Sequence, residues 1–257
     1  MPFLELEDHR LEYVWHGPGP EEAPTLVFLH EGLGSVSLWR DFPERLAGAV
    51  GWGALVYSRR GYGRSSPAPL PRPVGFMHDA AREELPRVLS LTGVRQTVLV
   101  GHSDGASIAL IYAAEHAGQA APRLRGLALL APHVFVEEET LAGARAAVEA
   151  FEHGDLAARL ARHHSDVENT FRGWSGVWLD PAFRSWSIEA LLPRVEVPVL
   201  VVQGENDGYG TLRQVEAISA GCRGPVTSFV LPRVGHVPFR DAPEETREAC
   251  TKLVSST

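Results

Sequence analysis

Hydrophobic and polar residues alternate along residues 4–15, and Glu7 and Asp8 interrupt this alternation as a turn. Alternation with a period of two predicts strands with one buried face. Further along the chain, nearly every residue in several short runs is apolar, as in parallel strands buried on both faces. We therefore expect an antiparallel hairpin at a sheet edge and six further strands, over residues 25–30, 53–58, 97–101, 126–131, 197–204 and 226–232.

Segments with helical periodicity separate most of these runs. They cover residues 38–49, 76–92, 105–116, 212–220 and 242–254. A succession of strand, helix and strand is typical of a mostly parallel sheet flanked by helices. The pattern thus predicts an α/β fold.

One interval, residues 133–195, breaks this succession, because it contains no convincing strand and is far longer than an ordinary connection. We interpret it as a short helical cap inserted into a core domain formed by residues 1–132 and 196–257. Helices are expected over residues 137–151, 155–164 and 167–179. Asp155 is the expected N-cap of the second helix.

The third helix of the cap carries an aromatic face, because Phe171, Trp174 and Trp178 follow one another at helical spacing. This face could pack on the core, or it could form the roof of a substrate pocket, since ligand sites are commonly lined by aromatic groups. We take Trp174 and Trp178 as candidate pocket residues.

The pentapeptide Gly101-His102-Ser103-Asp104-Gly105 follows an apolar run and precedes a helical segment. It matches G-x-S-x-G, in which a serine occupies a tight turn between strand and helix. Glycine is needed on both sides because larger residues would collide with the backbone. The N-terminus of the following helix favours negative charge that develops nearby. Ser103 is therefore the candidate nucleophile.

A serine nucleophile requires a histidine base and a carboxylate that orients this histidine. In a fold of this kind both follow the serine, the acid first, and each lies in a loop after a strand. Asp207 in the stretch QGENDGYG is the candidate acid, with Glu205 as its rival. His236 in the stretch GHVPF is the candidate base. The ordered set favours nucleophilic catalysis more strongly than the pentapeptide alone.

Several stretches resemble the α/β-hydrolase superfamily, and in particular small bacterial carboxylesterase-like serine hydrolases. They are FLHEGLGS, YSRRGYGRSS, GHSDG, VLVVQGENDGYG and GHVPF. The resemblance covers nearly the whole chain. It implies the fold of that superfamily and an acyl-enzyme mechanism that needs neither a cofactor nor a metal.

The resemblance also implies where an oxyanion hole would lie. Family members usually carry His-Gly followed by the residue whose backbone N–H completes the hole, whereas this chain has Glu31 in place of that glycine. By position, Gly32 and Asp104 would supply the two N–H donors, with Glu31 as the fallback for Gly32. Glu31 is also a candidate pocket residue. We expect the Asp104 side chain to cap the following helix rather than to touch substrate.

Other polar residues near these stretches are expected to be structural. His30 and His102 should hydrogen-bond the surrounding loops, because His236 already serves as the base. By resemblance, Arg59 should brace loops. His163 and His164 are interpreted as a surface pair, since adjacent helical residues point in different directions.

Composition and charge exclude several classes of partner. A net charge of −8 and a pI near 5.8 leave no basic surface for nucleic acid. The N-terminal residues lack the pattern of a signal peptide, and no apolar run approaches the ~18 residues of a membrane span. We expect a cytoplasmic monomer or homodimer without a membrane partner. Cys222 and Cys250 predict neither a disulfide nor a metal site.

The expected function is hydrolysis of small to medium-sized carboxylic esters, with a small-molecule ester as the partner. Carbon–carbon bond hydrolases of ring-cleavage products share the triad and are the main alternative, and lactonase or perhydrolase activity is open too. Haloalkane dehalogenases and epoxide hydrolases are disfavoured because their nucleophile is aspartate. A ligand receptor on the same fold is the non-enzymatic alternative, because a fold alone does not specify chemistry.

Overall fold

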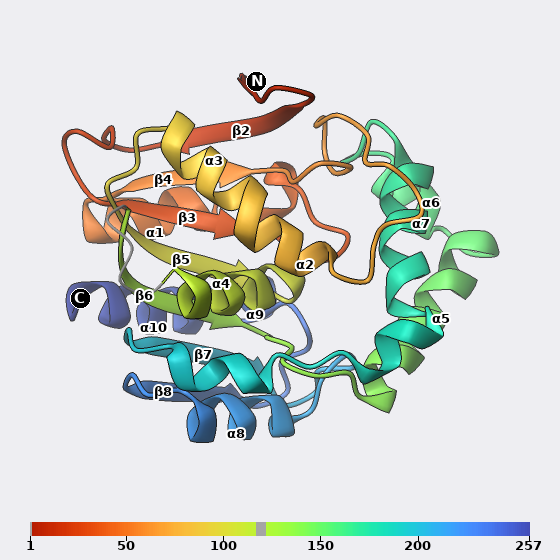
Figure 1. Ribbon diagram of the computed structural model, residues 1–257. Coiled ribbons are helices and arrows are strands. Elements are labelled where there is room, and N and C mark those ends of the chain that lie inside the picture. The colour runs from red at the N-terminus through yellow and green to blue at the C-terminus, as the bar shows by residue number, and fades with distance from the viewer. Residues whose placement is uncertain (1, 117–121) are drawn as a thin grey trace.

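The computed structural model describes residues 2–116 and 122–257 (Figure 1). Eight strands form one sheet in the order β1-β2-β4-β3-β5-β6-β7-β8. The first two strands are antiparallel to their neighbours and all other pairs are parallel. The strands are β1 (Phe3–Glu5), β2 (Arg10–His16), β3 (Thr25–Leu29), β4 (Gly53–Tyr57), β5 (Gln96–His102), β6 (Arg123–Leu130), β7 (Val199–Gly204) and β8 (Val226–Leu231). The edge hairpin and the six apolar strands are confirmed.

Helices cover both faces of this sheet, and alternate residues of β3 to β7 enter two separate cores. In β3, for example, Val27 and Leu29 belong to one core and Leu26 and Phe28 to the other. The edge strand β8 is exposed over residues 227–230, so the expected burial on both faces was wrong for this strand. The first core is closed by α2 (Phe76–Asp79), α3 (Leu85–Leu91), α4 (Asp104–Glu115) and α8 (Leu212–Gly221). The second is closed by α1 (Phe42–Val50), α9 (Pro238–Asp241) and α10 (Pro243–Ser255).

Two of the expected helices are subdivided. The segment predicted over residues 38–49 consists of a 3₁₀ turn, Val36–Trp39, and α1, because Arg40 between them has a positive φ of 55°. The segment predicted over residues 76–92 contains a π-helical turn, Ala80–Glu84, between α2 and α3. None of the helices in the described part of the chain has the length and apolar character that a membrane span requires.

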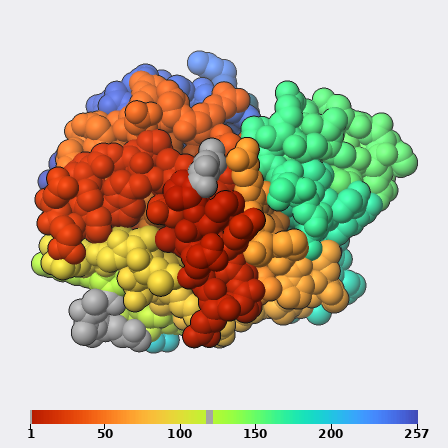
Figure 2. All heavy atoms as spheres, turned by 90° about the horizontal axis from the view of Figure 1, so that it is seen from above, coloured from red at the N-terminus to blue at the C-terminus, as the bar shows by residue number. Residues whose placement is uncertain are grey.

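The interval between β6 and β7 forms α5 (Glu138–Glu152), α6 (Leu156–Leu160), α7 (Val167–Trp178) and the 3₁₀ turns Pro181–Ser185 and Glu189–Arg194. These helices lie together beyond the carboxyl ends of the strands in Figure 1, and Figure 2 shows them in green as a bulge beside the N-terminal half. The division into core and cap at residues 133 and 195 stays a prediction.

The second helix of this interval differs from its predicted form. It ends at Leu160 rather than at residue 164. Asp155 occupies the N-cap position, but its side chain makes no capping bond and instead accepts from Arg159 at 3.3 Å. The predicted N-cap residue is confirmed by position, but its carboxylate pairs with Arg159 one turn further along instead of capping the helix.

The start of α4 lies directly against the sheet. A Cβ added to Gly105 would lie 1.9 Å from the carbonyl oxygen of Leu29, the last residue of β3, and a Cβ on Gly101 would lie 2.5 Å from the carbonyl oxygen of Gly105. Only glycine fits at such distances. The two glycines thus allow the turn around Ser103 to sit at the carboxyl edge of the sheet.

We expect Gly105→Ala to lower the free energy of unfolding by about 3 kcal/mol or more, because the methyl group must displace backbone rather than a flexible side chain. Gly48→Ala is the matched control, since a Cβ at this exposed helical glycine meets nothing within 4 Å. It should raise stability by about 0.5–1 kcal/mol. Urea denaturation measures both effects, and a Gly105→Ala variant as stable as the parent would contradict this account of the turn.

Candidate active site

Three loops at the carboxyl edge of the sheet bring Ser103, Asp207 and His236 together. Ser103 follows β5, Asp207 follows β7 and His236 follows β8. The hydroxyl of Ser103 donates to Nε2 of His236 at 3.0 Å, and Nδ1–H of His236 donates to Oδ2 of Asp207 at 2.8 Å. The three residues that the sequence predicted therefore form one unbroken chain of hydrogen bonds.

The backbone of Ser103 adopts a conformation that non-glycine residues rarely occupy, with φ 53° and ψ −119°. Three backbone bonds hold it there: its N–H donates to the carbonyl of Leu130 at 2.9 Å, and its carbonyl accepts from the N–H groups of Ala106 and Ser107 at 2.9 and 3.2 Å. The strained turn orients the hydroxyl toward His236, and the residue is almost fully buried.

Asp207 accepts hydrogen bonds from three partners. Besides His236, Nε2 of Gln203 donates to Oδ2 at 2.8 Å and the backbone N–H of Tyr209 donates to Oδ1 at 2.8 Å. Burial by itself would raise the pKa of Asp207, but the bonds from His236 and Tyr209 outweigh it, and the pKa is lowered. Glu205, the rival acid, instead faces the backbone N–H of Arg233 at 3.4 Å.

The hydrogen bonds of His236 fix the tautomer of its ring. Its Nδ1–H is engaged by Asp207, so Nε2 carries the lone pair that faces Ser103. The ring centroid of His133 lies 5.7 Å away, and burial lowers the pKa of His133 to about 3. His133 is therefore uncharged near neutral pH and places no second cation beside His236.

The predicted oxyanion residues lie in the loop after β3 and at the first position of α4. The first N–H groups of a helix have no partner within the helix, which applies to Asp104. Gly32 is covered by α7, because a Cβ on it would lie 2.1 Å from Nε1 of Trp174. The indole of Trp174 thus rests on the loop that would hold the oxyanion.

Glu31 contacts a histidine of the nucleophile turn. Its Oε2 lies 3.2 Å from Nδ1 of His102, whose Nε2–H donates to the backbone carbonyl of His236 at 2.7 Å. Burial would raise the pKa of Glu31, but the interactions with His102 outweigh it and lower the pKa to about 2. His102 therefore connects the loop after β3 with the loop that carries His236. These contacts agree with the structural role expected from the sequence.

Asp104 does not cap its helix, contrary to the sequence prediction. Its Oδ1 accepts from Nε1–H of Trp178 at 3.2 Å, and no side-chain capping bond forms at the start of α4. Burial raises the pKa of Asp104, against the opposing charge of Arg59. Asp104 is the first residue of α4 and so lies one position beyond the N-cap. The donor that it finds instead, Trp178 of α7, is distant in sequence and comes within reach only in the folded chain.

Arg59 braces the loop after β3, as the resemblance implied. Its Nη2 donates to the carbonyls of His30 and Glu31 at 3.1 and 3.0 Å, and its backbone N–H donates to Nε2 of His30 at 3.0 Å. Both residues are buried. The expected structural role of His30 is confirmed by the same contacts.

The interpretation of His163 and His164 as a surface pair was wrong for His164. His164 is 5% exposed, accepts from the backbone N–H of Gly63 at 2.9 Å and donates to the carbonyl of Leu33 at 3.0 Å. His163, in contrast, contacts the hydroxyl of Ser37 near the surface. The helix ends at Leu160, so the argument from helical geometry does not apply to the two histidines.

Sequence reasoning missed several residues of this site. Gln203, Tyr209 and His133 surround the acid and the base, yet none was singled out. Gln203 carried a usable signal, because it is a polar residue at the end of an otherwise apolar strand. His133 carried no signal, since its position beside His236 arises only from tertiary packing.

A family model described as alpha/beta hydrolase fold matches residues 24–191, well over half of the chain. The chain therefore belongs to the α/β hydrolase family. It is a hydrolase of the α/β hydrolase type with bacterial relatives.

Individual relatives differ in their chemistry. The chain is 28% identical over 221 residues to a putative carbamate hydrolase (RutD) of Stutzerimonas stutzeri, covering 77% of this chain and 79% of that protein. It is 26% identical to a 2-succinyl-6-hydroxy-2,4-cyclohexadiene-1-carboxylate synthase of Salmonella paratyphi A, covering 80% and 72%. The crystal structure of an enol-lactonase from Burkholderia xenovorans LB400 is similar with a TM-score of 0.76 and 18% identity, covering 99% and 100%.

We expect His164 to make stability depend on pH. Burial lowers its pKa from 6.5 to about 4, so on acidification the unfolded chain takes up the proton before the folded chain does. The contribution of neutral His164 to the free energy of unfolding is complete above pH 6.5. It is lost as the pH falls toward 4, at up to about 1.4 kcal/mol per pH unit. The free energy of unfolding, measured by urea denaturation at each pH in this range, should fall less steeply with acidification in His164→Gln than in the parent. Equal pH dependence in parent and variant would refute this assignment.

Proposed function

We propose that this chain is a serine hydrolase that cleaves carboxylic esters of small to medium size. One observation carries the proposal: the hydrogen-bond chain from Asp207 through His236 to a hydroxyl held on a strained turn. A serine hydroxyl is a weak nucleophile unless an adjacent base accepts its proton, and this geometry provides such a base.

In the proposed reaction, Oγ of Ser103 attacks the ester carbonyl while His236 Nε2 accepts the proton. Asp207 stabilises the imidazolium, and the backbone N–H groups of Gly32 and Asp104 bind the negatively charged oxygen. His236 then gives its proton to the departing alcohol, and an acyl-enzyme remains. Water, deprotonated by the same histidine, releases the acid and restores the hydroxyl.

The enclosure of the site supports a small acyl group. Trp174 lies on Gly32, and Trp178 bonds Asp104 beside the nucleophile. Both indoles belong to α7 and are buried. The two indoles of α7 therefore border the proposed oxyanion residues and would limit the length of an acyl chain bound beside them.

Replacement of the nucleophile tests the mechanism. We expect Ser103→Ala to lower kcat for 4-nitrophenyl acetate roughly 10⁴-fold or more, because the base is left without a nucleophile to activate. A fluorophosphonate probe should label the parent but not Ser103→Ala. Ser219→Ala is the control, because it removes an exposed serine of α8 and should leave the labelling unchanged. Undiminished labelling of Ser103→Ala contradicts the assignment, and labelling without multiple turnovers would favour the receptor alternative.

A substrate panel tests the chemistry and the size of the site. We expect kcat/KM to be highest for 4-nitrophenyl acetate or butyrate, and to fall about tenfold or more for the octanoate because the two indoles restrict the acyl site. Faster cleavage of a vinylogous diketone than of any ester would favour the carbon–carbon bond hydrolase instead, and faster opening of a lactone would favour a lactonase. A maximum at the octanoate would contradict the proposed enclosure.

A further inference from the structure

His102 is a fully buried histidine with a hydrogen-bond acceptor at each of its ring nitrogens. Its Nε2 lies 2.7 Å from the backbone carbonyl oxygen of His236, and its Nδ1 lies 3.2 Å from Oε2 of Glu31. A carbonyl oxygen only accepts, so Nε2 carries a proton. Burial would raise the pKa of Glu31, but His102 outweighs it and lowers this pKa to about 2, so near neutral pH the carboxylate also only accepts. Both nitrogens must then donate, which only the charged imidazolium can do.

Three other histidines around the site face one acceptor and one donor each. His30 donates from Nδ1 to the carbonyl of Glu31 at 2.7 Å, and its Nε2 accepts from a backbone N–H of the loop after β4 at 3.0 Å. His164 and His236 combine one acceptor with one donor in the same way. A neutral ring satisfies such a pair of partners, whereas a ring between two acceptors needs both protons. This difference singles out His102.

The surroundings of His102 make a charge costly unless it is paired. The rings of Trp39 and Phe239 lie beside it, at centroid distances of 6.2 and 5.3 Å, and exclude water. An unpaired charge in such a place would be strongly destabilising. Glu31 supplies the opposite charge from a tight turn, in which the backbone N–H of Gly34 donates to the Glu31 carbonyl at 3.1 Å. A Cβ on Gly34 would collide with the carboxylate, so glycine at this position leaves it room to reach His102.

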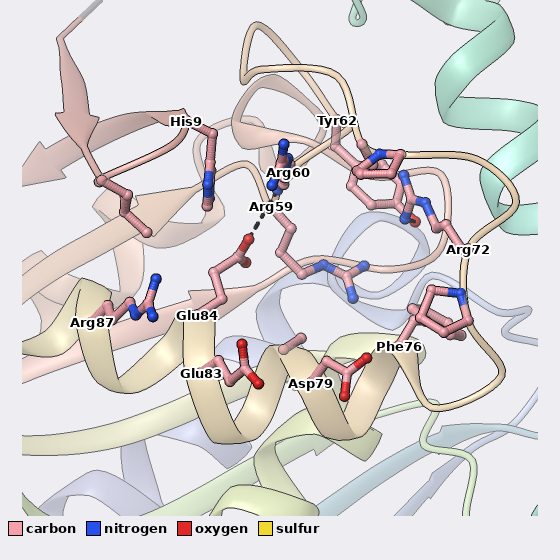
Figure 3. A pocket seen from close by; sticks show the side chains of 15 residues that line it. His9, Arg59, Arg60, Tyr62, Arg72, Phe76, Asp79, Glu83, Glu84 and Arg87 are labelled. Atoms are coloured by element: carbon pink, nitrogen blue, oxygen red, sulfur yellow. Dashed lines mark hydrogen bonds between the residues drawn. The ribbon is translucent and has the colours of Figure 1, made fainter.

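Other charged and titratable groups near Glu31 do not replace His102 as its partner. Arg59, which also lines the separate cavity of Figure 3, donates to the backbone carbonyl of Glu31 at 3.0 Å rather than to the carboxylate. Burial lowers the pKa of three neighbouring histidines below 6.5, so that they add no charge near neutral pH: His30, His163 and His164.

On its other side, His102 faces the loops of the triad. Burial lowers the pKa of His133 to about 3, so the His133 ring is neutral and adds no second cation. The carboxylate of Asp207 is engaged by His236, at 2.8 Å from its Nδ1. Glu31 is therefore the carboxylate that balances a charge on His102.

We propose that Glu31 and His102 form a buried carboxylate–imidazolium pair that positions the base of the triad. The imidazolium holds the backbone carbonyl of His236, and the carboxylate holds the imidazolium. The loop after β8 is thereby tied to the loop after β3. Both residues act through His236 and not on the reacting atoms. The catalytic effect of the pair rests on the ester hydrolysis proposed above, whereas its charge is a property of the folded chain alone.

NMR spectroscopy of the protein labelled with nitrogen-15 in its histidine rings tests the charge without reference to catalysis. At about pH 7.5, where an ordinary histidine is mostly neutral, we expect both ring nitrogens of His102 to carry protons. His102→Asn assigns these signals by their loss, and through-bond correlation to the backbone assigns them if that variant does not fold.

Glu31→Gln separates the charge from the hydrogen bond. We expect this variant to contain a neutral His102 ring, because the glutamine amide can donate to Nδ1 but cannot balance a positive charge. Glu44→Gln is the matched control. It removes an exposed carboxylate of α1, whose charge water screens, and should leave both protons on His102.

Kinetics tests the positioning role. We expect Glu31→Ala to lower kcat for 4-nitrophenyl acetate about tenfold or more and to leave KM within about twofold, because the base loses a support that substrate binding does not use. Glu31→Gln, which keeps a hydrogen bond to His102, should recover part of this loss. Glu44→Gln should match the parent in both constants. Circular dichroism shows whether each variant is folded.

Failure of the pair and failure of the proposed function give different results. A single protonated ring nitrogen on His102 in the parent would overturn the charged pair, and this measurement needs no variant. A folded Glu31→Ala variant with the kcat of the parent would overturn the positioning role. Absence of any ester hydrolysis would contradict the esterase, while the NMR measurement would still decide whether the pair is charged.

Discussion

The close approach of α4 to β3 at Gly105 is the constraint on which the site depends. The backbone of the helix lies against the carbonyls of Leu29 and His30, and a side chain at position 105 would separate them. Because of this contact, the strained turn at Ser103 and the loop that begins at His30 occupy one small region. In the proposed reaction a nucleophile and an oxyanion loop must lie this close together, so glycine at position 105 would serve the chemistry as well as the packing.

The loops of the acid and the base are held to each other by backbone contacts. The N–H groups of Glu205 and Asn206 donate to the carbonyls of Leu231 and Val234, each at 2.9 Å. A Cβ on Gly204 would lie 2.2 Å from the carbonyl oxygen of Gly235. The bond between Asp207 and His236 therefore joins two loops that backbone contacts already hold together, and little backbone entropy remains to be lost when it forms.

The sequence predicted what depends on local pattern and chain order. The apolar runs located the strands, and the order of Ser103, Asp207 and His236 identified the residues that meet, because parallel strands end at one edge. Features that depend on how the cap lies on the core escaped prediction. The bond of Trp178 to Asp104 and the burial of His164 join residues far apart in sequence. No periodicity within either segment encodes such a contact.

Helix α7 contacts the core at three places. Gly173 lies against Arg72, Trp174 lies on Gly32, and Trp178 bonds Asp104. Since these residues belong to one helix, its displacement would change all three contacts together, whereas rotation of a single side chain would change one. The position of α7 thus sets the surroundings of Gly32, Asp104 and Arg72, whereas Ser103, Asp207 and His236 are held by the sheet and its loops. In the proposed reaction, the packing of α7 on the sheet would therefore determine which substrates fit.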